Sequence, residues 1–310
     1  MQNTRRSARA GFLAGVLAYC CWGLIPLYWH LLAAATPTEI LSHRIAWTFV
    51  FILAVLGFEG RLPELARTVR SLTGPDRRTG VILVLAAAFS SANWLVNIAG
   101  VNTGHVVELG IGMFLTPLLT VAIGVLAFRE RLDRVQWAAV LLALFGLLVM
   151  IANFGSFPWF AVGVSSTWAT YSALKKKVEL SAWLSLAVEH GLMLLPALLY
   201  VLYLASAGEG HFLSGLGPRF DLALAAVGIV TAVPMIAFSF AAPRLPLVVL
   251  GFIQYINPIL TITLGVLFFG ESVTLSEAVP LVFIWSGIAL YSWAGIRKAN
   301  AVDRARARGR

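Results

Sequence analysis

Ten apolar runs, each about 20 residues long, constrain this chain more than any other feature of its sequence, because a helix of that length crosses a bilayer. The runs lie at 11–32, 38–58, 80–100, 104–128, 134–152, 158–174, 181–204, 220–240, 246–269 and 275–295. The 310 residues are 59% hydrophobic and 12% charged, whereas soluble domains are about 45–50% apolar and about 25% charged. Most of the apolar surface must therefore face lipid. The sequence predicts an all-α integral membrane protein and excludes an ordinary soluble enzyme.

The Lys and Arg residues are divided unevenly between the two ends of the predicted helices. Of the 23 basic residues, 21 lie at ends on the same side as the N-terminus, Arg219 lies on the other side, and Arg44 lies inside a helix. Cytoplasmic loops of membrane proteins carry such an excess. We therefore expect both termini in the cytoplasm, with residues 1–10 as a cytoplasmic N-terminus and 296–310 as a basic cytoplasmic tail. The net charge of +9 then reflects topology and not a nucleic-acid partner.

An internal repeat relates two segments that are 141 positions apart. Residues 109–130 read LGIGMFLTPLLTVAIGVLAFRE and residues 250–271 read LGFIQYINPILTITLGVLFFGE, with ten of 22 positions identical. The matches include Pro117 with Pro258 and Glu130 with Glu271. Two halves, 11–152 and 158–295, would each hold five helices. Because five is odd, the second half must enter the membrane inverted, which is an arrangement typical of transporters.

Polar residues at membrane depth are costly and usually face the interior of a bundle. We select as candidate substrate-binding residues the polar and aromatic side chains that the pattern places near the cavity of such a bundle. They are Trp22, His43, Arg44, Asn93, Trp94, Asn97, His105, Glu108, Phe114, Gln254 and Tyr255. Pro117 and Pro258 are candidate hinges, because a proline frees a backbone carbonyl and kinks a helix.

Glu189 is the one carboxylate that the pattern places near the midplane, about 12 Å along its helix at 1.5 Å per residue. A carboxyl group there could exchange a proton, so we expect Glu189 to be the proton-coupling residue. Arg44 lies in the other half, and the two charges could face each other across one cavity.

Several of these residues also admit a structural interpretation. Arg44 could extend to the outer interface, and Glu189 could be a protonated structural carboxyl. His105 and Glu108 could be interfacial. Asn93 and Asn97, which share a helix face, could bind neighbouring helices.

No motif in the sequence supports catalysis, cofactor binding or metal binding. The chain lacks Gly-x-Ser-x-Gly, His-Glu-x-x-His, a P-loop and a dinucleotide fingerprint. Cys20 and Cys21 are adjacent and have neither zinc nor disulfide spacing. We therefore expect no enzyme activity, no cofactor and no metal, and an ion gradient or the gradient of the substrate as the source of energy. The alternative is a membrane protein that does not transport, either an intramembrane enzyme or a scaffold.

Several segments of the chain together resemble the RarD group of EamA-type permeases, in the drug/metabolite transporter superfamily. These segments are AYCCWGLIPLYWHLL at 18–32, EILSHRIAWTFVF at 39–51, NWLVNIAGVNTGHVVELGIGMFLTPL at 93–118, ERLDRVQW at 130–137, TAVPMIAFSFAAPRLPL at 231–247 and LGFIQYINPIL at 250–260. The resemblance implies ten helices in a five-plus-five inverted repeat, with a central cavity between helices one to four and six to nine. It places helices five and ten at the periphery, as the candidate interface of a homodimer.

Together these observations predict a secondary transporter of the bacterial cytoplasmic membrane. Its cargo would be a small amphiphilic metabolite or drug-like solute, moved by alternating access and with proton-coupled efflux as one option. The resemblance adds an expected link to chloramphenicol sensitivity. The partners expected are this solute and the lipid bilayer.

Overall fold

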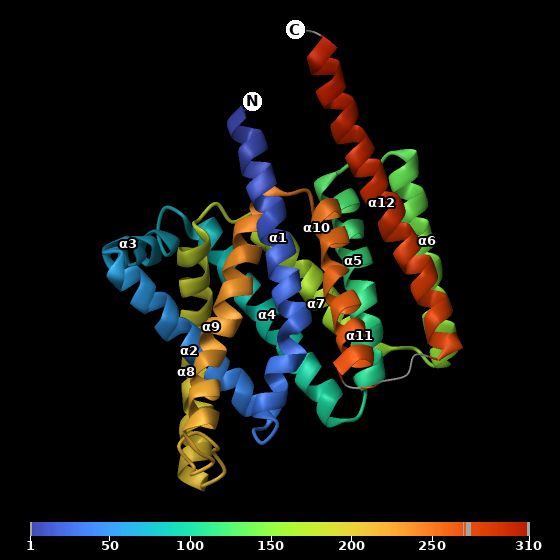
Figure 1. Cartoon of the computed structure of the whole chain (residues 1–310). Helices are drawn as coiled ribbons and strands as arrows, with labels where there is room; N and C mark the ends of the chain where they lie inside the picture. Colours follow the sequence, from blue (N-terminus) through green and yellow to red (C-terminus); the bar gives the residue numbers. More distant parts are fainter. Residues whose placement is uncertain (1, 269, 271–273, 309–310) are drawn as a thin grey trace.

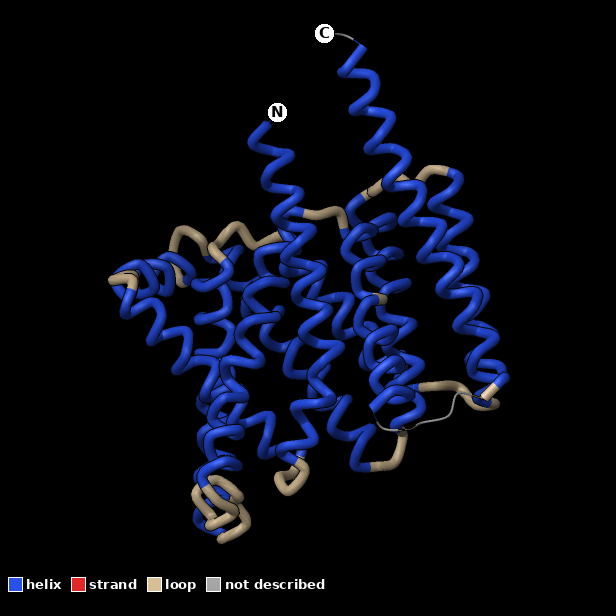
Figure 2. Tube along the Cα trace, in the orientation of Figure 1, coloured by secondary structure: helices blue, strands red, loops and turns tan. Residues whose placement is uncertain are grey.

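Long helices account for nearly all of the chain, and the computed structural model contains no strand in the residues that it describes, which are 2–268, 270 and 274–308. The elements are α1 (Gln2–Trp29), η1 (His30–Leu32), α2 (Pro37–Phe58), α3 (Leu62–Leu72), α4 (Arg77–Asn102), α5 (Val106–Phe128), α6 (Arg134–Phe154), α7 (Trp159–Lys176), α8 (Ala182–Ala207), α9 (Pro218–Ala241), η2 (Ala242–Arg244), α10 (Leu247–Gln254), α11 (Ile256–Phe268) and α12 (Leu275–Arg308). Short loops join them at the two ends of the bundle (Figure 1, Figure 2).

Within the described ranges, nine helical segments are long and apolar enough to cross a membrane. They are Arg6–Leu32, Pro37–Phe58, Arg77–Asn102, Val106–Phe128, Arg134–Phe154, Ala182–Ala207, Pro218–Arg244, Leu247–Phe268 and Ala278–Gly295. The remaining expected span, 158–174, forms the 18-residue helix α7 but is not one of these nine. The sequence of α7 is rich in Ser and Thr and ends in lysines. Phe269 and Glu271, two partners in the internal repeat, lie outside the described residues.

The expected span 246–269 is present as the apolar segment Leu247–Phe268, but its helix is interrupted at Tyr255 between α10 and α11. Pro258 has no N–H with which to bond the carbonyl of Gln254, so one hydrogen bond of the regular ladder is missing there. The N–H of Tyr255 instead bonds the carbonyl of Phe252 in a tighter turn, at 3.3 Å. In contrast, α5 runs unbroken through Pro117.

Two other segments are more helical than expected. The connection 59–79 contains α3, in which Leu65, Thr68 and Leu72 face inward while Arg67 and Arg70 remain exposed. Both termini continue as helix, since α1 begins at Gln2 and α12 reaches Arg308.

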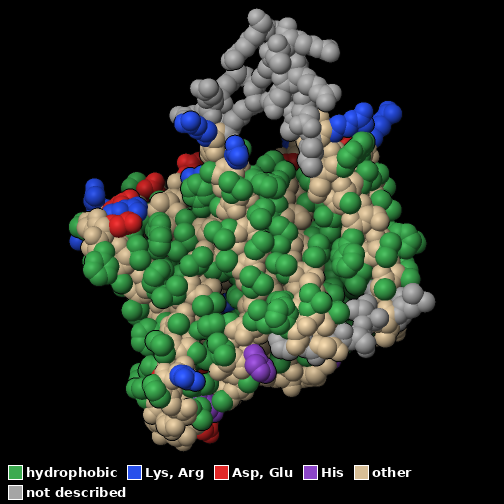
Figure 3. Space-filling model, viewed as in Figure 1, with side chains coloured by type: hydrophobic (Ala, Val, Ile, Leu, Met, Phe, Trp, Pro, Cys, Tyr) green, Lys and Arg blue, Asp and Glu red, His purple; other side chains and the backbone are tan. Residues whose placement is uncertain are grey.

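Charged and apolar side chains occupy different zones of the surface. Hydrophobic side chains cover the middle of the face seen in Figure 3, and most visible Lys and Arg gather at the end from which both termini project (Figure 1). The α5–α6 and α9–α10 loops reach this same end. We refer to it below as the basic end.

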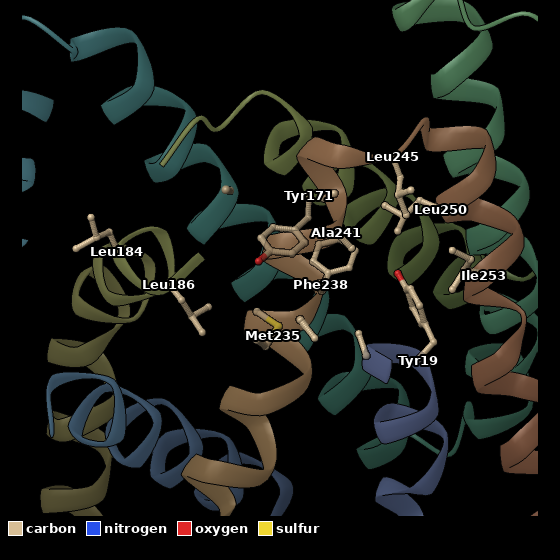
Figure 4. Packing of buried hydrophobic residues seen from close by; sticks show 14 of the residues in the cluster. Tyr19, Tyr171, Leu184, Leu186, Met235, Phe238, Ala241, Leu245, Leu250 and Ile253 are labelled. Atoms are coloured by element: carbon tan, nitrogen blue, oxygen red, sulfur yellow. The ribbon is translucent and has the colours of Figure 1, made fainter. Parts of the chain in front are cut away.

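The largest buried cluster joins α1, α2, α4, α7, α8, α9 and α10. The rings of Tyr171 and Phe238 stack at its centre with their centroids 5.7 Å apart, and Tyr19 lies beside them (Figure 4). Trp22 and Trp168 pack edge to face at 5.2 Å between α1 and α7. Segments far apart in sequence therefore share one core.

Candidate substrate-binding site

Two cavities lie side by side in the bundle and share Trp94 as a common wall. The first, which we name the Arg44 cavity, has a volume of about 480 Å³ and lies between α2, α4, α8 and α9. The second, which we name the central cavity, has a volume of about 340 Å³ and lies between α1, α4, α5, α7, α10 and α11. Both are within or near the range of about 300–1,000 Å³ that is typical of small-molecule sites.

Arg44 is held inside the bundle by the way α2 begins. The Thr36 side chain caps the helix by accepting from the N–H of Glu39, and Pro37 occupies its first turn. Arg44 follows about two turns later, with 7% of its surface exposed. Its guanidinium carbon lies 3.3 Å from the centroid of the Trp94 ring, in a cation–π contact between α2 and α4. Its Nε atom has no hydrogen-bond partner among the described residues.

The remaining wall of the Arg44 cavity is mostly apolar, with a few hydroxyl groups and one imidazole. Ser90, Thr231 and His190 are buried polar side chains in this lining. His190 Nδ1 lies 3.1 Å from the carbonyl oxygen of Leu186. A cation, hydroxyls and apolar walls together suit a ligand with both a polar and an apolar part.

The central cavity is lined by aromatic and amide side chains. Trp22, Trp94 and Trp168 contribute rings, and Gln254 contributes an amide. The Gln254 oxygen accepts from the Thr120 hydroxyl at 3.2 Å, whereas its Nε2 has no hydrogen-bond partner in the described part of the chain. A buried amide donor without a partner is available to a solute that carries an acceptor.

Asn93 and Asn97 line the central cavity, but their side-chain N–H groups donate hydrogen bonds within the protein. Asn93 Nδ2 donates to the Val164 carbonyl at 2.7 Å and to the Thr167 hydroxyl at 3.1 Å, which ties α4 to α7. Asn97 Nδ2 donates to the Asn93 carbonyl at 2.8 Å. Asn97 Nδ2 also donates to Asn93 Oδ1 at 3.4 Å, so among the described residues the side-chain oxygen of Asn97 is the amide group left to interact with a solute.

Glu189 lines neither cavity and is enclosed between α7 and α8. Its Oε1 lies 2.5 Å from Lys175 Nζ and accepts from the Ser185 hydroxyl at 2.9 Å. Its Oε2 accepts from the Tyr171 hydroxyl at 3.0 Å. The expectation that Arg44 and Glu189 face each other across one cavity is therefore wrong, because Lys175 supplies the counter-charge of Glu189.

Lys175 is one of the basic residues at the helix ends on the side of the N-terminus, but its side chain turns into the bundle. Its side chain is 1% exposed, and it also donates to the Ser185 hydroxyl. A run of three lysines gives no signal of which one turns inward. The helical phase of α7 places Lys175 one turn after Tyr171, on the buried face.

The other candidates lie away from both cavities, within the described part of the chain. His43 is buried against Phe212, with ring centroids 5.1 Å apart. His105 stacks on Phe160 at 4.6 Å, and Glu108 caps α7 by accepting from the Phe160 N–H at 2.9 Å. These contacts hold the structure together and do not reach a cavity.

Phe114, Tyr255 and the prolines occupy the interface between α5 and the α10–α11 segment. The Tyr255 hydroxyl donates to the Phe114 carbonyl at 3.4 Å, and neither residue lines a cavity. Pro117 lines the central cavity, whereas Pro258 is buried and contributes only through its neighbours Asn257 and Thr261.

The described residues contain no cluster of side chains that could bind a metal. No group of three or more His, Cys, Asp or Glu side chains gathers there. The arrangement can therefore bind, orient and desolvate a solute through aromatic, amide and guanidinium groups.

Comparison with known proteins identifies the kind of bundle that holds these cavities. The EamA-like transporter family matches residues 9–152 and again residues 157–293. The chain belongs to this family of membrane transporters. Within the family it falls in the RarD group of the drug/metabolite transporter superfamily, and it is a multi-pass membrane protein.

Relatives of this EamA-like transporter are similar over nearly their whole length. Protein RarD of Streptomyces exfoliatus is 40% identical over 97% of this chain and 92% of its own. An uncharacterized transporter of Vibrio cholerae is 36% identical over 99% of both chains. A solved structure with 20% identity covers 92% of this chain and 98% of its own at a TM-score of 0.69, which supports the fold.

Proposed function

We propose that this EamA-like transporter moves a small amphiphilic solute across the bacterial cytoplasmic membrane by alternating access. In this proposal the halves 11–152 and 158–295 form a five-plus-five inverted repeat that rocks about the two cavities. The ten spans comprise the nine apolar segments and α7. Because α7 contributes Val164 and Trp168 to the central cavity and buries Ser165, Ser172 and Lys175, its interior position explains why it can be less apolar than the others.

One observation carries the proposed symmetry: a contact between the two halves recurs when each partner is replaced by its equivalent 141 positions away. A side chain at Gly146 would lie 2.6 Å from the Pro280 carbonyl oxygen, and one at Gly287 would lie 2.6 Å from the Ala139 carbonyl oxygen. Gly287 and Pro280 are the repeat equivalents of Gly146 and Ala139. Such reciprocal contacts are expected where a pseudo-two-fold axis passes between the helices.

The same relation holds nearer the cavities. Phe114 and Tyr255 are repeat equivalents and contact each other through the Tyr255 hydroxyl. The packing of α1 against α9 and α11 likewise mirrors that of α7 against α4 and α5. Both observations support two halves related by inversion.

We further propose that the central cavity holds the transported solute. It lies between elements of both halves, and its aromatic rings and the free Gln254 amide suit an amphiphilic molecule. A Pseudomonas aeruginosa relative, 28% identical over 94% of this chain, is named chloramphenicol-sensitive protein RarD. Chloramphenicol is therefore our first test solute, and a chloramphenicol phenotype is part of the proposal.

Glu189 remains the proposed proton-coupling residue. A proton that reaches Glu189 would neutralise the partner of Lys175 and weaken the contact between α7 and α8. Coupling would then work through a broken ion pair and not through direct competition with substrate.

The test is uptake of labelled chloramphenicol, and of solutes found by metabolite profiling of a deletion strain, into proteoliposomes with an imposed pH gradient. Wild-type protein should show gradient-driven uptake. Glu189→Gln, and the double variant Lys175→Met/Glu189→Gln, should lose the response to pH while keeping solute binding. An unchanged pH response in both variants would make Glu189 structural and refute the coupling. Absence of uptake for every profiled solute would refute the transport proposal.

A homodimer through α6 and α12 remains a prediction. These helices pack against each other at one side of the bundle. Their exposed surface includes Phe145, Leu148 and Trp285. Contact with lipid would also account for this apolar surface. Cross-linking in native membranes tests the dimer.

A further inference from the structure

Arg44 is a buried cation without a counter-charge among the described residues. Among the described residues no ion pair or side-chain hydrogen bond reaches its guanidinium, whose contact is the cation–π stacking on Trp94. Two buried carboxylates, Glu39 on the same helix and Glu189 on α8, have other partners. Glu39 Oε1 accepts from the His211 N–H at 2.6 Å, and Glu189 is paired with Lys175. A buried charge without a partner is strongly unfavourable, so this arrangement favours a partner from outside the chain.

The Arg44 cavity also has an apolar wall that reaches the outer surface of the bundle. Val84 and Leu95 of α4 and Leu192 of α8 line the cavity and are 52%, 61% and 48% exposed. All three lie well inside membrane-spanning helices. Because these helices are long and apolar enough to cross a membrane, we expect the exposed edge of the cavity between α4 and α8 to face acyl chains.

A molecule that suits both features must combine a negative charge with an apolar body. Its oxyanion would bind the guanidinium, which presents planar N–H donors to carboxylate or phosphate. Ser90 and Thr231 hydroxyls lie in the same lining and are available to the remaining oxygens. Its apolar part would lie along Val84, Leu95 and Leu192. The volume of about 480 Å³ accommodates a compact organic acid or part of a lipid.

We infer that the Arg44 cavity is a binding site for an amphiphilic organic anion that enters laterally from the bilayer between α4 and α8. The inference rests on the proposed transport function and names the substrate class for it. Because Trp94 is the wall between the two cavities and stacks on Arg44, an anion bound there would contact the residue that separates it from the central cavity.

Equilibrium binding without any gradient tests this site independently of transport. Full-length protein in phosphatidylcholine nanodiscs is titrated with phenylbutyrate and with the neutral phenylbutyramide. Charge-assisted hydrogen bonds predict that wild-type protein binds the acid at least about tenfold more tightly than the amide. Arg44→Gln should remove this difference, and Arg219→Gln, an exposed arginine outside the cavities, should not.

A second arm distinguishes a dissolved acid from a lipid headgroup. Phosphatidylglycerol is added to the nanodiscs, and native mass spectrometry counts the lipids that remain bound. If the lipid occupies the site, wild-type protein retains one more phosphatidylglycerol than Arg44→Gln does. Arg44-dependent binding of either anion supports the site and identifies its source.

Ala88→Leu provides a test that leaves Arg44 intact. Ala88 lines the cavity and is exposed, so a leucine there should fill the space and weaken acid binding about tenfold or more. Equal affinity of wild-type protein for acid and amide, with no phosphatidylglycerol retained that Ala88→Leu loses, would overturn the inference even if Arg44→Gln does not fold. Proteoliposome uptake that persists in that case would leave the transport proposal standing.

Discussion

Lys175 and Glu189 form a buried ion pair in which Nζ lies 2.5 Å from Oε1 and each side chain is 1% exposed. The pair joins the last turn of α7 to the second turn of α8, with hydrogen bonds from Ser185 and Tyr171 to the carboxylate. Its members come from a lysine run at a helix end and from an isolated glutamate.

Removal of one member of this pair should be more harmful than removal of both. Lys175→Met leaves Glu189 buried without its counter-charge and should cost about 3–5 kcal/mol of stability. The double variant Lys175→Met/Glu189→Gln should recover much of that loss. Lys177→Met, at an exposed position two residues away, is the control and should be neutral. Thermal unfolding in nanodiscs measures all three, and equal effects of Lys175→Met and Lys177→Met would contradict the burial of Lys175.

Glu130 should stabilise the basic end by capping α10. Its two oxygens accept from the N–H groups of Leu247 and Val248 at 2.8 and 2.9 Å, and Lys176 Nζ lies 3.3 Å away. Loss of such a cap costs about 0.5–2 kcal/mol, so Glu130→Ala should lower the unfolding temperature. Glu179→Ala removes an exposed carboxylate near the same end and should not. Hydrogen exchange should also quicken at the start of α10 only in the first variant, and unchanged exchange there would argue against the cap.

Because α6 and α12 approach closely at two glycines, a side chain at either position should destabilise the protein. Gly146→Ala and Gly287→Ala each place a methyl group 2.6 Å from a backbone oxygen of the other helix. Overpacking of this kind costs about 1–3 kcal/mol. Gly295→Ala, in the same α12 but with nothing within 4 Å, should be neutral or slightly stabilising. Similar unfolding temperatures for all three variants would show that α6 and α12 are not in this contact.

The two prolines should affect movement more than folding. Pro117 lines the central cavity in a continuous helix, whereas Pro258 follows the break at Tyr255. Pro117→Ala and Pro258→Ala should each reduce uptake per molecule of protein in the membrane. Uptake and abundance are measured on the same vesicles. A parallel loss of both quantities would assign the prolines to folding.

The division of basic residues predicts the topology directly. Reporter fusions after one set of positions should report the cytoplasm: Arg78, Arg134, Lys177 and Arg297. Fusions near Ser156 and Glu209 should report the other side. The inverted repeat requires Arg134 and Lys177 to lie on the same side, and opposite reports from these two positions would exclude it.

The polar candidates show how far residue type and depth predict a site. Arg44, Trp94, Trp22 and Gln254 do line cavities, and each is a polar or aromatic side chain placed by helix depth. Glu108 has the same kind of signal, but it caps α7. Depth along a helix cannot distinguish these outcomes, since the direction in which a side chain points depends on which helix packs beside it.

The sequence by itself determined that this protein is a helical, multi-pass membrane transporter of the EamA-like family. An apolar run of about 20 residues satisfies its own backbone hydrogen bonds as a helix in lipid, so that choice needs no partner. Only the tertiary structure decided that Lys175 meets Glu189, that Trp94 separates two cavities, and that the chain breaks at Tyr255 while α5 continues through Pro117. Each of these depends on the rotation and packing of helices that are distant in sequence, because a buried polar group takes whichever partner its neighbours bring within reach.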